Sequence, residues 1–169
     1  MRLIPVFALI SGLFCGSALA GDPLPEGLLA QHQAQSACDS MDWLPIRDDG
    51  EVHPLPGGAV LYLVPCYAGA YNFAWRFYID RDGSGTYEVL YFADYSERWG
   101  WTGTDVLYLP TFDEKTLELT SYYKGRGIGD CGTSGRWVWD EYLFRLVEYR
   151  AKDDCDGSGA PGEFPVVYP

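Results

Sequence analysis

The chain has 169 residues, of which 24 are acidic and 12 are basic, and its formal net charge at pH 7 is −12. Such a surface repels nucleic-acid phosphates and anionic lipid headgroups, so the composition argues against nucleic-acid or membrane-surface binding. Basic proteins and cations are the partners that this charge favours, although net charge also serves solubility alone.

Residues 1–20 predict a secretory signal peptide. Arg2 supplies a positive start, Leu3–Cys15 is an apolar run too short for a membrane anchor, and Ala18–Ala20 provide a small-residue cleavage site. We therefore expect a periplasmic or secreted protein of a Gram-negative-type bacterium, with residues 21–169 forming one disulfide-stabilised β-rich domain. We expect no membrane insertion after cleavage, because no later apolar run is long enough to span a bilayer.

One short helix is predicted within Pro23–Cys38, where helix formers are frequent. Prolines and glycines then break the chain repeatedly, and segments rich in aromatic and β-branched residues alternate with turn residues. The expected strands are Ala59–Pro65, Asn72–Ile79, Thr86–Ala93, Val106–Leu109, Thr116–Tyr122, Arg136–Trp139 and Leu143–Tyr149. Turns at Arg81–Gly85 and Glu141–Tyr142 predict two hairpins. The pattern favours a mainly β (α+β) fold in which an antiparallel sheet forms a barrel or a sandwich.

Apart from Cys15, the chain carries Cys38, Cys66, Cys131 and Cys155. An even number of cysteines in an exported protein implies two disulfides, for which three pairings are possible. Chain order favours Cys38 with Cys66 and Cys131 with Cys155, but chain order does not settle the pairing. Zinc is the competing use, and the absence of any Cys-x-x-Cys pair argues against it. Lipidation of Cys15 is a weaker alternative to signal cleavage, because the residue before it is not small.

Several motifs occur in a distinctive order. They are LVPCYAGAYN around Cys66, LPTFDEKTLELTSYYKGRGIGDCG up to Gly132, then GRWVWD, Cys155 and FPVVYP at the end. From roughly Ala37 onwards this order resembles the bacterial exported family catalogued as domain of unknown function 1176, in its cysteine-rich C-terminal part. The resemblance implies export, cysteine pairing and a mostly β domain. It implies no substrate, because that family has no assigned activity.

The string Asp-x-Asp-Gly-Ser-Gly occurs at Asp80–Gly85 and again at Asp154–Gly159. Oxygen donors at alternate positions followed by glycine match the first half of a calcium-binding loop. In the first copy the candidate ligands for Ca²⁺ are Asp80, Asp82, Ser84 and Glu88. Tyr91 stands where such a loop needs a bidentate glutamate, so we favour a tight hairpin turn over a calcium site.

Two segments are candidates for ligand binding. Lys124 and Arg126 form a basic island whose glycines leave backbone amides accessible to an anion. The simpler interpretation is that these cations pair with neighbouring acids such as Asp130. Tyr95, Trp99 and Trp101 are expected in a loop, where rigid aromatic rings bind sugars or proteins. Burial of these rings beneath the loop is the rival interpretation and is slightly favoured, since six tryptophans in one domain must mostly be buried.

Catalysis is not expected, because the sequence shows no convincing nucleophile, base or metal constellation. We interpret the chain as a periplasmic non-catalytic binding domain that recognises a protein or a cell-wall glycan. One alternative is an inhibitor of a basic cell-wall hydrolase such as lysozyme, which the acidic charge would attract. The segment Ser84–Glu88 resembles the Ser-Gly-x-x-Tyr motif of a lysozyme inhibitor family but is one residue short. The other alternative is a calcium-dependent module.

Overall fold

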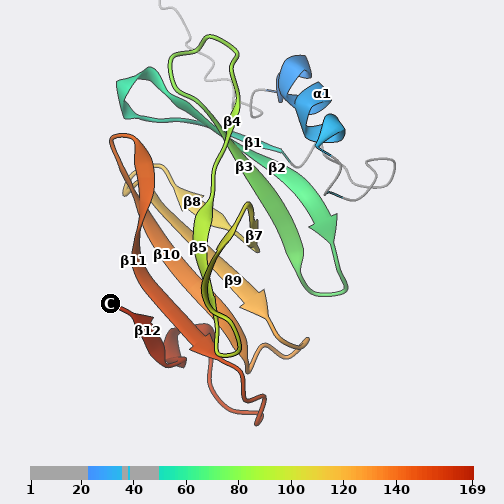
Figure 1. The fold of residues 1–169 in the computed structure, drawn as a ribbon, viewed down its shortest axis with the longest axis vertical. Coiled ribbons are helices and arrows are strands. Elements are labelled where there is room, and N and C mark those ends of the chain that lie inside the picture. The colour runs from blue at the N-terminus through green and yellow to red at the C-terminus, as the bar shows by residue number, and fades with distance from the viewer. Residues whose placement is uncertain (1–22, 36–37, 39–49) are drawn as a thin grey trace, which may run out of the picture.

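The structure is a computed structural model that describes residues 23–35, 38 and 50–169, so the predicted signal peptide and Cys15 lie outside it. Figure 1 shows one helix, α1 (Glu26–Ala34), followed by a chain of mostly short strands. The strands are β1 (Glu51–Pro54), β2 (Val60–Ala68), β3 (Phe73–Asp80), β4 (Glu88–Val89), β5 (Phe92–Ser96), β6 (Gly100–Thr104), β7 (Val106–Tyr108), β8 (Thr111–Asp113), β9 (Glu118–Lys124), β10 (Gly132–Asp140), β11 (Leu143–Lys152) and β12 (Val166–Tyr168). Two short 3-10 helices, η1 (Pro56–Gly58) and η2 (Pro161–Glu163), lie in the connections.

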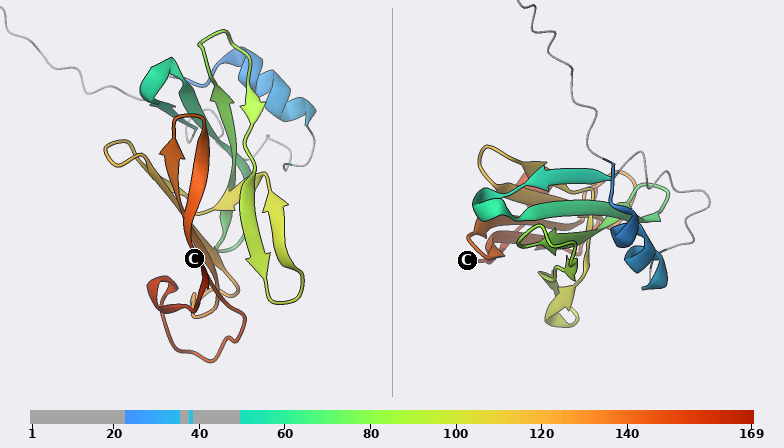
Figure 2. Two further views of the ribbon diagram at one scale, coloured as in Figure 1. Left: turned by 60° about the vertical axis from the view of Figure 1, so that its left-hand side comes forward. Right: turned by 90° about the horizontal axis from the view of Figure 1, so that it is seen from above.

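The strands form three antiparallel sheets. The first has the order β1-β2-β3-β4, with β7 also paired to β3, and the second has the order β12-β11-β10-β9-β8. The third is the β5–β6 hairpin, which projects from the two large sheets in both views of Figure 2. The expected mainly β, antiparallel fold is confirmed. Of the two expected architectures the barrel is wrong, because the sheets stay open and share one core, as the layers of a sandwich do.

Aromatic side chains fill the space between the two large sheets. Phe77 of β3, Phe92 of β5 and Trp137 of β10 are all buried, and their rings meet edge to face. The ring centroids of Phe77 and Phe92 are 5.1 Å apart, and those of Phe92 and Trp137 are 5.5 Å apart. Trp137 and Trp139 of β10 both enter this core, as expected for alternate residues of one strand.

The two predicted disulfides are both present. Cys38 and Cys66, with Cα atoms 4.6 Å apart, join the segment after α1 to β2. Cys131 and Cys155, with Cα atoms 4.9 Å apart, join the start of β10 to the loop that follows β11. Each cross-link restricts the unfolded chain, which typically stabilises a fold by about 2–4 kcal/mol.

The prediction of one short helix within Pro23–Cys38 is confirmed, since α1 begins after Pro25 and ends at Ala34. The strand predictions need two corrections. The single strand expected over Thr86–Ala93 is broken into the two-residue β4 and the separate β5. After the break the chain leaves β3 and pairs with β6 from Phe92, whose ring is buried in the core shared with the second sheet. In addition, β1, β8 and β12 were not predicted, being only three or four residues long.

The loop expected around Trp99 and Trp101 is instead a β-hairpin. Trp101 lies in β6 opposite Tyr95 of β5, and Trp99 lies in the turn between these strands. Gly100 has a φ of +71°, which suits glycine, and the Ser96 hydroxyl accepts the Trp99 N–H at 3.2 Å. These turn interactions therefore close a hairpin that the strand propensity of the segment did not predict.

Helix α1 packs on the outer face of the first sheet, next to β2 and β3 (Figure 1). His32 of this helix is buried, with Nδ1 2.9 Å from the Tyr78 hydroxyl and Nε2 3.1 Å from the Pro65 carbonyl oxygen. A carbonyl can only accept, so Nε2 carries the proton and the Tyr78 hydroxyl donates to Nδ1. Burial, together with the charge of Arg76, lowers the pKa of His32 to about 4.

The buried histidine makes the fold acid-sensitive. Because the folded-state pKa of about 4 lies below the ordinary value of 6.5, the stabilisation is present above pH 6.5 and is lost as the pH falls towards 4. We expect the free energy of unfolding of the wild type to fall between pH 7 and about pH 4.5 by roughly 2–3 kcal/mol more than that of a His32→Gln variant.

Urea unfolding at both pH values measures this difference. The contributions of the other titrating groups cancel in the comparison of the two proteins. They include the contribution of His53, whose pKa is raised by Glu51 and Glu114. Equal acid sensitivity of the two proteins would contradict the assignment.

Candidate functional site

A groove of about 520 Å³ opens where the β5–β6 hairpin, β7 and the second sheet meet. Its walls carry Tyr95, Tyr108, Tyr123 and Tyr149, together with the carboxylates of Asp94 and Asp153. We call this the tyrosine groove. Its volume lies within the range of pockets that hold small molecules or short segments of a polymer.

One wall of the tyrosine groove is fixed by hydrogen bonding and ring packing. The Tyr149 hydroxyl donates to Asp94 Oδ1 at 2.5 Å, which joins β11 to β5. Burial, and then the neighbouring Asp94 carboxylate, raise the pKa of Tyr149, so this hydroxyl remains a donor and orients the carboxylate. Trp101 packs against both Tyr95 and Tyr149, with ring centroids at 5.2 and 5.5 Å, and therefore supports this wall.

The opposite wall contains Tyr108 of β7 and Tyr123 of β9. Their ring centroids are 5.0 Å apart with an interplanar angle of 55°. Burial is the main cause of the raised pKa of Tyr108, whereas Tyr123 is 39% exposed and offers part of its ring to solvent. The pair presents an apolar surface with two hydroxyl groups.

The predicted basic loop is held by an internal ion pair. Arg126 donates to both carboxylate oxygens of Asp130, Nε to Oδ1 at 2.7 Å and Nη2 to Oδ2 at 2.5 Å. The Gly157 N–H also donates to Asp130, at 2.6 Å. These bonds, chiefly those from Arg126, lower the pKa of Asp130 to about 2. The pairing of Arg126 with Asp130 that sequence favoured is therefore present, and it ties this loop to the loop after β11.

Lys124 contributes mainly through its backbone. Its N–H donates to Asn72 Oδ1 at 3.0 Å, and its carbonyl oxygen accepts from Asn72 Nδ2 at 2.9 Å. This two-way bond joins the end of β9 to the β2–β3 hairpin. The Lys124 ammonium group lies 5.9 Å from the centre of the Tyr122 ring.

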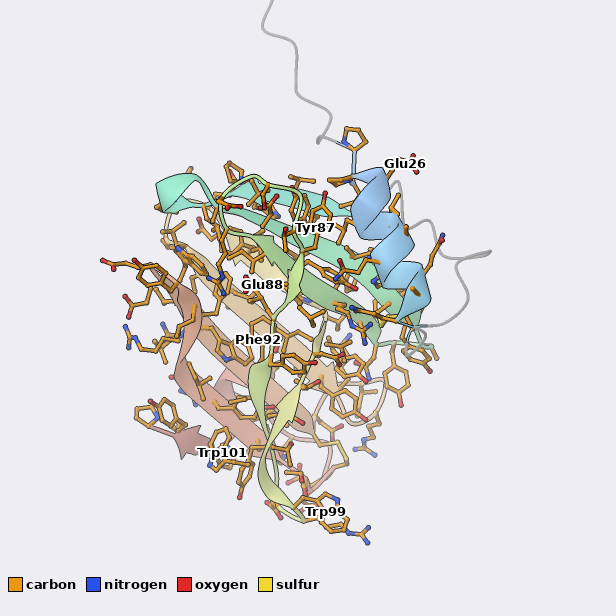
Figure 3. All side chains as sticks on the ribbon, turned by 45° about the horizontal axis from the view of Figure 1, so that its top comes forward. Glu26, Tyr87, Glu88, Phe92, Trp99 and Trp101 are labelled. Carbon is orange, nitrogen blue, oxygen red and sulfur yellow. A yellow bond between two sulfur atoms is a disulfide. The ribbon has the colours of Figure 1, made fainter. Side chains whose placement is uncertain are left out.

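The structure brings the two predicted binding segments to one groove, although their predicted side chains do not line it. The hairpin contributes Tyr95 and Ser96, and the basic loop contributes Gly125 and Cys131. Figure 3 shows Trp99 at the far tip of the hairpin, where it is 71% exposed, and Trp101 closer to the second sheet. The Arg98 guanidinium lies 4.6 Å from the Trp99 ring centre.

Sequence reasoning singled out Tyr95, together with Trp99 and Trp101, but it missed Tyr108, Tyr123 and Tyr149 of the groove. Tyr123 lies inside the distinctive SYYKG segment and could have been suspected there. Tyr108 and Tyr149 carry no local signal, because only the packing of strands distant in sequence brings them together.

The proposed calcium segment forms the turn between β3 and β4. Asp80 is 3% exposed, and its carboxylate accepts the backbone N–H groups of Ser84 at 3.1 Å and Gly85 at 2.8 Å. Glu88 pairs with Arg81 at 2.9 Å, and Asp82 Oδ1 accepts the Ser84 N–H at 3.1 Å. Within residues 23–35, 38 and 50–169, no group of three or more His, Cys, Asp or Glu side chains is placed to hold a metal ion. Calcium binding by this turn stays a prediction.

The hydrogen bonds of Asp80 suggest a structural role that can be separated from calcium binding. We expect Asp80→Ala to destabilise the protein by about 1–3 kcal/mol, since it removes the buried carboxylate whose charge-assisted hydrogen bonds from Ser84 and Gly85 hold the turn. Asp82→Ala serves as the matched control on the exposed side of the same turn. Urea unfolding should give the same loss in the free energy of unfolding for Asp80→Ala in millimolar Ca²⁺ and in excess chelator. Stabilisation of the wild type by Ca²⁺ that vanishes in this variant would instead establish a cation site.

Together these features define a disulfide-bonded, antiparallel β domain with a tyrosine-lined groove. Of the helices described, none is long and apolar enough to cross a membrane. The chain belongs to the family described as "Protein of unknown function (DUF1176)", whose model matches residues 23–169. The family resemblance seen in the sequence is therefore confirmed.

One curated relative is the "Uncharacterized protein YpfG" of Escherichia coli (strain K12). It is 34% identical over 127 residues, which cover 73% of this chain and 36% of the relative. This chain therefore spans only about a third of that relative's length. No solved structure matches the chain significantly.

Proposed function

We propose that this protein is an exported, non-catalytic binding domain that holds a cell-wall glycan in the tyrosine groove. The observation that carries the proposal is the convergence of four tyrosines from three sheets on one groove of about 520 Å³. Phenol rings combine a flat apolar face with a polar edge, and both features match a pyranose ring with its equatorial hydroxyl groups. A groove of this composition suits sugar stacking better than the binding of a charged polymer.

The polar groups of the groove support the same ligand class. Asp94 is oriented by the Tyr149 hydroxyl, and Asp153 lies on the same groove, so both can accept hydrogen bonds from sugar hydroxyls. The disulfide between Cys131 and Cys155 forms part of the wall and reduces the ordering cost of binding.

Two observations favour binding over catalysis. The cysteines in the groove are joined to each other, which removes a nucleophilic thiol, and no histidine lies among the residues described as lining it. Asp94 is bonded to a tyrosine whose pKa is raised, an arrangement that positions a carboxylate without supplying a proton-transfer partner near neutral pH.

The two disulfides support a placement outside the cytoplasm, because disulfides persist in oxidising compartments. The periplasm is the oxidising compartment in which a domain of this size meets cell-wall glycan. The signal peptide expected over residues 1–20 agrees with export.

The proposal predicts measurable binding of β-1,4-linked N-acetylglucosamine oligomers, which we use as soluble probes. Isothermal titration calorimetry with the tetramer should detect binding to the wild type. Tyr123→Ala, which removes an exposed stacking ring, and Asp94→Asn, which weakens a hydroxyl acceptor, should each weaken it roughly tenfold, or about 1.4 kcal/mol.

Tyr142→Ala is the matched control, because Tyr142 is 71% exposed in the β10–β11 turn and does not line the groove. Failure of the wild type to bind these oligomers and solubilised peptidoglycan strands would end the proposal. A lysozyme activity assay in parallel tests the competing interpretation as an inhibitor, which the net charge of −12 favours.

A further inference from the structure

A second cavity of about 550 Å³ adjoins the tyrosine groove. Tyr108, Tyr123 and Val106 line both spaces, so the two are separated only by side chains that they share. Its remaining walls come chiefly from the β2–β3 hairpin and include Tyr67, Tyr71, Arg76 and Asp105. We call it the arginine cavity.

Arg76 is a buried cation with unused hydrogen-bond donors. Its side chain is 3% exposed, and its Nη2 atom donates to Asp105 Oδ2 at 2.6 Å. Nε and Nη1 are buried and have no hydrogen-bond partner among the described residues. Native structures satisfy nearly all buried donors, so two unsatisfied N–H-bearing atoms on a side chain that lines a cavity point to an acceptor outside the described residues.

The charge of the pair selects the kind of acceptor. Asp105 already neutralises Arg76, and a second carboxylate or phosphate in the cavity would lie close to the Asp105 anion. A neutral oxygen, such as a hydroxyl or an acetamido carbonyl, accepts from the guanidinium without that repulsion. Asp105, at 34% exposed, retains oxygen lone pairs that can accept from a neighbouring hydroxyl.

The rim of the cavity is aromatic and open to solvent. Tyr67 is 45% exposed and Tyr71 is 39% exposed, and both rings border the space that contains Arg76. Gly127 of the β9–β10 loop lies beside the Tyr71 ring, and a Cβ added there would be in van der Waals contact with the ring at 3.5 Å. Aromatic faces next to paired donor and acceptor groups repeat the composition of the tyrosine groove.

We propose that the arginine cavity is a second sugar subsite, which binds a neutral hydroxyl- or acetamido-bearing residue of the same glycan chain that occupies the tyrosine groove. This inference rests on the proposed function. Tyr108 and Tyr123 line both spaces, so their rings contact the glycan chain where it passes from the tyrosine groove to the arginine cavity. The ligand is therefore a linear oligosaccharide longer than one groove can hold, and filling the second subsite raises affinity without an additional association cost.

Calorimetric titration with the β-1,4-linked N-acetylglucosamine dimer, tetramer and hexamer tests the inference. For the wild type, affinity should rise at least tenfold from dimer to hexamer. Arg76→Lys removes the guanidinium fork, and Tyr67→Ala removes a rim ring that lines only the arginine cavity. Each should bring the ratio of hexamer to dimer affinity close to one, whereas Tyr142→Ala should leave the ratio unchanged.

The outcomes separate the two proposals. If no oligomer binds, the proposed function fails and the second subsite fails with it. If the oligomers bind with an affinity that does not depend on length, or if Tyr67→Ala retains the full length dependence, the second subsite is overturned while the groove proposal stands. Tighter binding of a glucuronic acid hexamer than of the neutral hexamer would overturn the assignment to a neutral sugar. Tyr67→Ala keeps the test valid even if Arg76→Lys fails to fold.

Discussion

The position of the groove depends on the packing of Phe92 between the two large sheets. Its buried ring meets Phe77 of the first sheet at 5.1 Å and Trp137 of the second at 5.5 Å, measured between ring centroids. Phe92 is also the first residue of β5, which follows β4 after a two-residue break. The contact that joins the layers therefore fixes where the chain leaves the first sheet, and Asp94 and Tyr95 reach the groove wall only two and three residues later. Core packing and site geometry are set by the same side chain.

The glycine-rich motif around Cys131 has a structural explanation at the other end of the groove. A Cβ at Gly132, where φ is +131°, would lie 1.9 Å from the Tyr123 carbonyl oxygen, and one at Gly125 would lie 2.8 Å from the Cys131 sulfur. Only glycine permits β9 and β10 to approach so closely beside a disulfide. Gly125, Cys131 and Gly132 all line the tyrosine groove. The segment that most clearly identifies the family in the sequence therefore forms a wall of the candidate site.

Local sequence patterns predicted the features that depend on residues close together in the chain. Alternation and turn residues located most strands, and the cysteine positions in the chain led to both disulfides. The eight residues from Thr86 to Ala93 alternate like one strand, but the chain changes its pairing partner from β3 to β6 within them, and no local pattern reports that change. The hairpin around Trp101 was missed because Gly100 and Gly103 interrupt the strand signal that its tryptophan and threonine residues give. The groove tyrosines could not be predicted as a group, since Tyr108 and Tyr149 meet only through tertiary packing.

The distribution of charge bears on the class of ligand. Most basic side chains in the described part of the chain are held in ion pairs with acids, namely those of Arg76, Arg81, Arg126, Arg136, Arg145, Arg150 and Lys152. Because these cations are already compensated, the surplus of 24 acidic over 12 basic residues sets the long-range potential of the surface. A polyanion would be repelled during approach and would find an uncompensated cation neither in the tyrosine groove nor beside Asp105. A neutral glycan experiences no such barrier, and its hydroxyl groups can use the carboxylates as acceptors. Under the proposed function, the excess of acid would therefore disfavour anionic polymers while supplying hydrogen-bond acceptors to a neutral one.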